Sequence, residues 1–362
     1  MHHARKVRIS RLKMSDPVLK FSYSEDDFIF YTDPKKKSLF DEQLREIWET
    51  KMVNNCFRYQ LGNLKTKILQ DNFQFVVQLN IKRGIERRTP QLVSNIVMPF
   101  DYEKFHFGKV NEREIIFIIQ PQHWCELKPE NSTEVYKHVL LINVSPLEFG
   151  HSLLVPCIDK CSPQVLNFNA LRLAVEIILI SSDCYLRLGF NSLGAYASVN
   201  HLHFHAYYLN YNLYLESAPV THLIGRCFTL TSFPSEGFVF EVLEKEEILE
   251  VVSSVMELIN FLVEKRLPHN IFLTRGKRLI PSEMKNDGQY SVRLYIWARE
   301  AFYGTKYDLS FNVAVCELAG HISIKDEESF QNITEDDIST CLRDTCHNIF
   351  TAIKDDVQKL YE

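Results

Sequence analysis

Hydrophobic residues in this chain follow two different periods, and both periods occur many times. Short apolar runs over 114–119, 138–143 and 152–156 are rich in Ile, Leu and Val, which predicts buried strands. Residues 170–181 are apolar almost throughout, and residues 244–264 repeat apolar positions every three or four residues, so both predict helices. The same reasoning gives strands over 73–79, 185–190, 200–209, 270–274 and 292–298, and helices over 41–48, 311–319 and 335–360. This mixture predicts an α+β fold.

The chain is long enough for two domains or for one domain built from two halves. We expect a poorly ordered, basic tail over 1–20, which vaguely resembles a mitochondrial presequence but is better explained as disorder. A first half over 21–210 would carry the catalytic residues, and a second half over 211–362 would complete the site. Lys82–Gly84 and Arg87–Pro90 predict a basic loop.

Three histidines, His201, His203 and His205, stand at every second position of one expected strand. Side chains alternate between the faces of a strand, so the three imidazoles would share one face, about 6.5 Å apart. The intervening Leu202 and Phe204 would then enter the core. Such a row is typical of nucleotide chemistry or of metal binding.

Charge limits the possible partners. The 362 residues include 41 basic and 46 acidic side chains, which gives a net charge of −5. This balance argues against a nucleic-acid binder but allows a local basic pocket for phosphates. No apolar run reaches the 18 or so residues that span a bilayer, so we expect no membrane association.

Nine cysteines, an odd number without paired spacing, indicate reduced thiols and a cytoplasmic location. The closest pair, Cys157 and Cys161, is not followed by a matching second pair, so we expect no metal clip there.

Glycines add to the histidine signal. Gly189 and Gly194 bracket Asn191 and Ser192 shortly before the triad. Glycine lets a backbone approach a ligand closely, and Asn and Ser side chains can donate to phosphate oxygens. Beside three aligned imidazoles, we interpret this segment as a phosphate-binding loop.

The segment from Gly189 to His205 resembles the histidine-triad superfamily of nucleotidyl transferases and hydrolases. Four further segments narrow the resemblance to the GDP-D-glucose phosphorylases, an animal family related to the plant GDP-L-galactose phosphorylases. Those plant relatives carry Gln at the third triad position, where this chain has His205. The resemblance covers roughly residues 70–330, and its segments are 143–151, 191–194, 269–276 and 311–321.

This resemblance implies a fold like that of the histidine-triad and galactose-1-phosphate uridylyltransferase enzymes, with antiparallel sheets, flanking helices and two related halves. It also implies a reaction. His203 would attack the α-phosphorus of a GDP-hexose and release hexose 1-phosphate, and inorganic phosphate would then attack the guanylylated histidine to give GDP. A neutral imidazole suits this role at pH 7, and the resemblance implies no metal or cofactor.

Other polar side chains would orient the nucleophile or hold phosphate. Arginine suits a phosphate seat because its guanidinium binds an oxyanion in a bidentate manner. An aromatic residue from the first half, among Phe100, Tyr102 and Phe105, would stack on guanine. The predicted supporting residues are His201, His205, Asn191, Ser198, Asn200, Arg275 and Arg299, with Lys306 behind the two arginines.

Three alternatives stay open from the residues alone. The histidine row could bind zinc, although no residue spacing in the sequence indicates the further ligands and the carboxylate base that a zinc hydrolase needs. Water could replace phosphate as the acceptor, which would make the protein a GDP-sugar or nucleotide hydrolase. The site could also bind nucleotides without catalysis. The preferred hexose and the oligomeric state do not follow from the sequence.

Overall fold

A computed structural model of the chain describes residues 18–31, 37–88, 91–127, 137–280, 290–303 and 310–362. Residues 1–17 of the expected tail and Lys306 lie outside the described residues. Within them, the structure is the α+β arrangement that the sequence predicts, with large antiparallel sheets and flanking helices.

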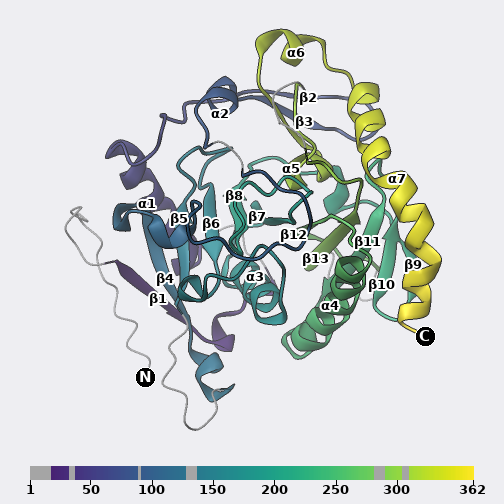
Figure 1. Ribbon diagram of the computed structural model, residues 1–362, viewed down its shortest axis with the longest axis horizontal. Helices are drawn as coiled ribbons and strands as arrows, with labels where there is room; N and C mark the ends of the chain where they lie inside the picture. Colours follow the sequence, from purple (N-terminus) through teal and green to yellow (C-terminus); the bar gives the residue numbers. More distant parts are fainter. Residues whose placement is uncertain (1–17, 32–36, 89–90, 128–136, 281–289, 304–309) are drawn as a thin grey trace.

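One eleven-stranded sheet runs through the molecule and takes strands from both halves of the sequence (Figure 1). The strands of the two halves join where β7 pairs with β12, and all neighbours are antiparallel except β1 and β4. In spatial order the strands are β1 (Leu19–Tyr23), β4 (Ile115–Pro121), β5 (His138–Ile142), β6 (Ser152–Val155), β8 (Phe204–Tyr208), β7 (Leu186–Asn191), β12 (His269–Lys277), β13 (Tyr290–Ala298), β11 (Gly237–Val242), β10 (Cys227–Leu230) and β9 (Thr221–Ile224).

A second, three-stranded sheet also joins the halves, because β14 (His321–Ile324) pairs in parallel with β3 (Val76–Leu79), which pairs with β2 (Lys65–Ile68). This small sheet lies at the top of Figure 1. The helices are α1 (Leu39–Val53), α2 (Ile81–Ile85), α3 (Phe168–Ile180), α4 (Ile248–Glu264), α5 (Val315–Leu318), α6 (Glu327–Asn332) and α7 (Glu335–Leu360).

The long periodic segments form the helices and strands that their patterns predict. Three local expectations are wrong. The basic segment at Lys82–Gly84 lies in α2 rather than in a loop, and the helix expected over 311–319 is only α5. The triad strand begins at Phe204 because the backbone N–H groups of Leu202 and His203 bond to Ser162 and Gln164 in a loop instead of to a strand.

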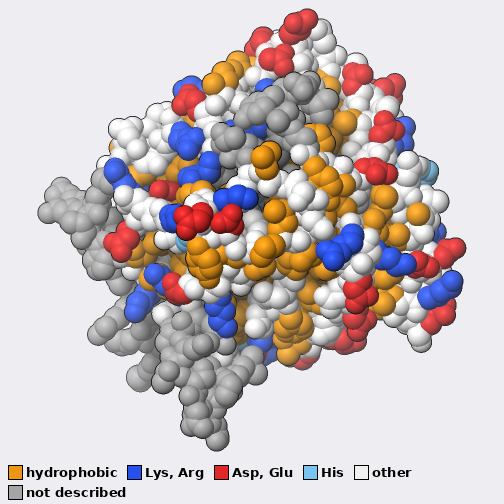
Figure 2. Space-filling model, viewed as in Figure 1, with side chains coloured by type: hydrophobic (Ala, Val, Ile, Leu, Met, Phe, Trp, Pro, Cys, Tyr) orange, Lys and Arg blue, Asp and Glu red, His pale blue; other side chains and the backbone are white. Residues whose placement is uncertain are grey.

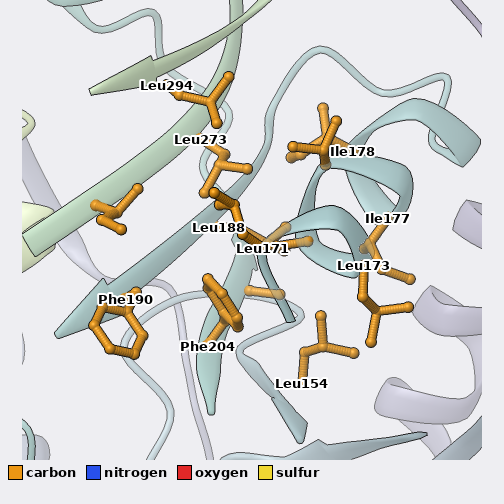
Figure 3. Packing of buried hydrophobic residues seen from close by; sticks show 14 of the residues in the cluster. Leu154, Leu171, Leu173, Ile177, Ile178, Leu188, Phe190, Phe204, Leu273 and Leu294 are labelled. Atoms are coloured by element: carbon orange, nitrogen blue, oxygen red, sulfur yellow. The ribbon is translucent and has the colours of Figure 1, made fainter. Parts of the chain in front are cut away.

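Helices α3 and α4 pack against each other and cover one face of the large sheet. Figure 3 shows Leu171 and Ile178 of α3 beside the strand residues Leu188 and Leu273. All four side chains are almost completely buried. Burial of a side chain of this size contributes roughly 1.5–3 kcal/mol, so this face holds the main core.

The opposite face of the large sheet carries α5 and the small sheet. A Cβ atom on Gly189, in the middle of β7, would lie 2.6 Å from Cγ1 of Val315 in α5. Only glycine therefore lets α5 pack this closely on the strand. The expectation that Gly189 belongs to a phosphate-binding loop is corrected, because the group that approaches it is a helix of the same chain.

Within β8, strand alternation places Phe204 and His205 on opposite faces as expected, whereas His201 and His203 precede the strand. Leu202 and Phe204 are buried in the core beneath α3. His205 pairs with Gly189 of β7, and it faces the same side of the sheet as α5. The chemistry-bearing side chains thus lie on the face opposite α3.

The same alternation corrects the prediction for Arg275. Arg275 stands two residues after Leu273 on β12, so its side chain points toward α3 and away from the triad face. Its Nη2 donates to the carbonyl oxygens of Ile29 (2.6 Å), Ile178 (3.1 Å) and Ser181 (2.9 Å). Arg275 is therefore a structural residue that satisfies carbonyls at the C-terminal end of α3, and not a phosphate ligand.

On the described part of the face in Figure 2, acidic and basic side chains are interspersed with hydrophobic ones. This face therefore carries no extended region of a single charge. Among the described residues, no helix combines the length and the apolar composition needed to cross a membrane.

Replacement of Arg275 by Met should lower the free energy of unfolding by about 2 kcal/mol or more, because buried carbonyls lose a charged donor. Urea denaturation monitored by circular dichroism measures this change. Lys277→Met, at the exposed end of the same strand, is the control and should change stability by less than about 0.5 kcal/mol. Equal stability of the two variants would contradict the structural role of Arg275.

Candidate active site

The hydrogen bonds around His203 fix its tautomer. Its Nδ1 lies 2.9 Å from Gln164 Oε1 and 2.7 Å from the carbonyl oxygen of His201. Gln164 Nε2 donates to the carbonyls of Asn191 and His203, so Oε1 is the acceptor. Both neighbours of Nδ1 are acceptors, and Nδ1 must carry the proton. The lone pair of His203 is therefore on Nε2, where an attacking nitrogen needs it.

Burial keeps His203 uncharged. Only 3% of the residue is exposed, and this burial lowers the pKa of His203 to about 4, although the hydrogen bond to the His201 carbonyl acts in the opposite direction. At neutral pH the imidazole is therefore the free base. A nucleophile must be in this form to attack phosphorus.

Gln164 holds His203 in place, and Asn200 in turn holds Gln164. The Gln164 carboxamide also accepts the backbone N–H of His203 at 2.9 Å. Asn200 Oδ1 accepts the backbone N–H of Gln164 at 2.9 Å, while its Nδ2 donates to the carbonyls of Met98 and Pro99. Asn200 therefore positions Gln164, and the prediction that it donates to phosphate is corrected. Gln164 has no sequence motif around it, and the sequence analysis missed it.

His201 contributes through its backbone. Its Nδ1 accepts the N–H of Phe107 at 3.1 Å, and the ring packs against Phe100 and His106. Burial lowers the pKa of His201 to about 3, with the neighbouring His203 and His106 acting in the same direction. The ring is neutral and enclosed, while the carbonyl orients His203.

His205 is oriented by His151, which directly precedes the neighbouring strand β6. His151 Nδ1 accepts the N–H of Leu147 at 2.7 Å. Burial lowers the pKa of His151 well below its ordinary value, which keeps the ring neutral. His151 Nε2 lies 3.0 Å from His205 Nδ1 and 3.2 Å from Asn143 Nδ2. These contacts hold the His205 ring next to His151.

Two pockets meet at the triad. We call the first the polar pocket and the second the apolar pocket; the space within them, open solvent included, is about 710 Å³ and about 760 Å³. The residues that line both pockets, and so mark their junction, are Arg83, Arg87, Ser198 and His205.

The two pockets differ in chemistry. His203 lines the apolar pocket, whose walls include Phe105, Phe107, Val110, Leu141, Leu153 and Val199. The polar pocket receives residues from both halves of the chain, among them Asn80, His151, Asn191, Asn312, Glu317 and Lys325. The junction thus separates an apolar compartment beside His203 from a compartment rich in hydrogen-bonding groups.

Three of the arginine and lysine side chains that line the two pockets come from the basic segment after residue 81, and Lys325 comes from the second half of the chain. Arg83 and Arg87 line both pockets, Arg88 lines the apolar pocket, and Lys325 lines the polar pocket. The sequence analysis noted this charge cluster but did not assign it to the site. The clustering of arginines in a segment outside the main strands was the signal that could have found them.

The remaining predicted residues divide between the pockets and their surroundings. Ser198 lines both pockets and Asn191 lines the polar pocket. Asn191 Oδ1 accepts from Asn270 Nδ2 and from the N–H of Val315, so its side chain can serve a ligand only as a donor. Arg299 donates to the carbonyl of Val313 and lies over the Tyr196 ring, 5.1 Å from its centroid. Arg299 therefore packs behind Tyr196, a residue that lines the polar pocket, and is not itself a lining residue. The prediction that Arg299 contacts phosphate directly is corrected.

One expected aromatic residue lies at the site. Phe105 lines the apolar pocket, whereas Phe100 packs against His106 and His201, and Tyr102 is largely exposed.

Glu317 is an acid inside the polar pocket. Burial raises its pKa to about 7, although the backbone N–H groups it faces and the nearby Arg83 and Lys325 act in the opposite direction. Its Oε2 accepts the N–H of Ala314 at 3.0 Å. The side chain therefore changes charge near neutral pH beside the cations of the junction.

Among the described side chains, no group of three or more His, Cys, Asp or Glu residues is arranged to hold a metal ion. The triad imidazoles are directed to different partners, with Nδ1 of His201 facing Phe107 and Nδ1 of His203 facing Gln164.

Comparison with known families gives a match over nearly the whole described chain. Residues 39–207 match the GDPGP1-like N-terminal domain, and residues 219–361 match the GDPGP1-like C-terminal domain. The chain belongs to this family. The family resemblance stated from the triad segment is confirmed.

The relatives in this family carry consistent names. GDP-D-glucose phosphorylase 1 of Danio rerio is 40% identical, with 89% of this chain and 92% of that protein covered. The Homo sapiens protein of the same name is 39% identical, with 84% and 78% covered. GDP-L-galactose phosphorylase 1 of Arabidopsis thaliana is 32% identical, with 80% and 66% covered.

A solved structure confirms the fold. Yeast Ap4A phosphorylase Apa2 in complex with Ap4A has a TM-score of 0.58 at 15% identity, with 85% of this chain and 97% of that chain covered. The histidine-triad type of fold expected from the sequence is therefore present.

The tautomer of His203 can be measured directly. In ¹⁵N-histidine spectra at pH 7, we expect Nδ1 of His203 to be protonated and Nε2 to be bare, because both neighbours of Nδ1 are acceptors. The ring should titrate near pH 4 rather than near the ordinary 6.5. His203→Ala assigns the signal. A proton on Nε2, or a midpoint near 6.5, would contradict the assignment.

Proposed function

We propose that the protein is a GDP-hexose phosphorylase, with GDP-D-glucose as the substrate that the names of its Danio rerio and Homo sapiens relatives indicate, and that His203 is its nucleophile. The observation that carries the proposal is a neutral histidine whose lone pair is on Nε2, in the wall of the apolar pocket and two residues from His205 at the junction with the polar pocket. GDP-D-glucose phosphorylase 1 is the name of the relatives at 39–40% identity in Danio rerio and Homo sapiens.

The two pockets suit the two ends of a GDP-hexose. The guanosine would lie in the apolar pocket beside His203, and the hexose phosphate would lie in the polar pocket. The diphosphate would then cross the junction, where Arg83, Arg87 and Ser198 supply donors. Residues such as Lys325 of the 211–362 half would complete the site, which supports the proposed division of labour between the two halves.

In the first step, His203 Nε2 attacks the α-phosphorus. A nitrogen–phosphorus bond forms, and the bond from the α-phosphorus to the oxygen that bridges it to the β-phosphorus breaks. Hexose 1-phosphate leaves with the electron pair of that bond. The His203 ring gains a positive charge, which its Nδ1–H shares with Gln164 Oε1 and the His201 carbonyl. His205 would lie beside the phosphate oxygens, and the junction arginines would neutralise the charge that develops on them.

In the second step, an oxygen of inorganic phosphate attacks the α-phosphorus of the guanylylated histidine. The nitrogen–phosphorus bond breaks, the electron pair returns to His203 Nε2, and GDP leaves. The polar pocket, vacated by hexose 1-phosphate, would hold the incoming phosphate. The same cations thus serve a phosphate group in both steps, which favours phosphate over water as the acceptor.

We place this reaction in the cytoplasm. The eight cysteines whose side chains the structure describes are free thiols, which supports a reducing compartment.

A product assay tests the proposed reaction. The protein is incubated with GDP-glucose, GDP-mannose and GDP-L-galactose, each with and without phosphate. We expect phosphate-dependent formation of GDP and hexose 1-phosphate. His203→Ala should lower turnover by about 10⁴-fold or more, because the nucleophile is lost, while the protein stays folded. His222→Ala, on the exposed strand β9, is the control.

Two results would change the proposal. Phosphate-independent release of GMP would identify a hydrolase that uses the same histidine. Full turnover of His203→Ala would exclude His203 as the nucleophile.

The role of Lys325 gives a separate prediction. Its Nζ donates to Asn312 Oδ1 at 3.2 Å in the polar pocket, outside the apolar one. Lys325→Met should raise the KM for phosphate about tenfold to a hundredfold, since a charged donor to phosphate is lost. Affinity for GMP should change little. Lys82→Met, an exposed residue of α2, is the control, and an unchanged KM in both variants would place the acceptor phosphate elsewhere.

A further inference from the structure

Two charged side chains of opposite sign, Arg88 and Glu114, line the apolar pocket but not the polar one. Arg83 and Arg87 also line the apolar pocket, but they belong to its junction with the polar one. The Arg88 guanidinium lies over the Phe105 ring, 3.1 Å from its centroid. Among the described residues that line the apolar pocket, Glu114 is the only acid. Burial lowers the pKa of Arg88 and the carboxylate of Glu114 acts in the opposite direction, so the two side chains lie near each other in this pocket.

The position of Glu114 is fixed by a local turn. Glu114 ends the 3₁₀ helix η3 (Glu112–Glu114) at the start of β4, and its Oε1 accepts the backbone N–H of Asn111 at 3.2 Å. This is the capping-box bond, which both Glu and Gln can make. A carboxylate accepts about four hydrogen bonds, so the cap leaves acceptor capacity for a ligand.

Guanine carries the complementary pattern. Its N1–H and N2–H₂ donors stand side by side, which matches a carboxylate, and its O6 and N7 are acceptors that match a guanidinium. Adenine presents a bare ring nitrogen in place of N1–H, so a carboxylate would face a lone pair. Ribose hydroxyls also bind carboxylates, but they give no role to the neighbouring guanidinium.

We propose that Glu114 recognises the N1–H and N2–H₂ edge of guanine and determines the base specificity of this site, with Arg88 on the O6 side. This inference rests on the proposed function, because it requires the nucleoside to lie in the apolar pocket. Glu114 would act in binding, and the chemistry at His203 would not depend on it directly.

Calorimetric binding of three nucleoside diphosphates tests the proposal without catalysis. GDP has the 2-amino group, inosine diphosphate lacks it, and xanthosine diphosphate carries a carbonyl oxygen there. The wild-type protein should bind GDP at least about tenfold more tightly than it binds inosine diphosphate. It should bind xanthosine diphosphate more weakly than either, because the Glu114 carboxylate repels the carbonyl oxygen at that position.

Glu114→Gln should weaken GDP binding about tenfold or more and strengthen xanthosine diphosphate binding, since the new amide can donate to that carbonyl. A gain of affinity cannot result from misfolding, and Gln keeps the bond to Asn111. Glu112→Gln, an exposed residue of the same turn, should leave all three affinities unchanged.

Two outcomes overturn the inference in different ways. If Glu114→Gln weakens the three nucleotides equally, Glu114 contacts the ribose or the phosphates and does not recognise the base, while the proposed function stands. If the wild-type protein binds no guanine nucleotide, the proposed function fails and the inference fails with it.

Discussion

The structure of the site depends on one buried hydrogen-bond acceptor pair, Gln164 Oε1 and the His201 carbonyl, around Nδ1 of His203. An imidazole has two nitrogens, and only the one without a proton can attack. Two acceptors at Nδ1 leave a single low-energy arrangement for the neutral ring, with the lone pair of Nε2 at the pocket. The same acceptors stabilise the positive charge that the ring gains when it is guanylylated. Orientation before the reaction and charge stabilisation during it thus come from the same contacts.

One face of the large sheet carries the hydrophobic core, and the opposite face carries the candidate active site. Its α3 face is filled by aliphatic side chains such as Leu188 and Leu273, and the opposite face carries the triad, α5 and the polar pocket. Because a strand alternates its side chains, each inward hydrophobic residue of β7, β8 and β12 places its neighbours on the site face. The pairing of β7 with β12 also brings the two halves of the sequence into one sheet. Asn191 and Asn270, one from each half, are partners in that pairing and bond to each other at the site.

The parts of this architecture with local causes were predictable from sequence. Long amphipathic or apolar segments such as α4 and α7 follow from periodicity, and the opposite faces of Phe204 and His205 follow from alternation. The prediction that all three imidazoles share one strand face is wrong, because His201 and His203 precede β8. The same alternation rule could have prevented the error at Arg275. Leu273 and Arg275 stand two residues apart on one strand, so their side chains point to the same face, and the hydrophobic Leu273 predicts that this face is the core. Gln164 and Lys325 could not have been found, because they reach the site through contacts between segments distant in sequence. Asn200 has the right chemistry for a phosphate donor, but its side chain is used by Gln164, Met98 and Pro99.

The central claim is that the α-phosphorus is transferred twice, first to His203 and then to phosphate. Stereochemistry at that phosphorus tests it most directly, because each in-line displacement inverts the configuration. The substrate is a GDP-hexose in which sulfur of known configuration replaces one non-bridging α-oxygen, and the product is the corresponding thio-GDP formed with phosphate. Two displacements through His203 predict overall retention of configuration. Inversion would show a single direct attack by phosphate and would contradict the covalent mechanism.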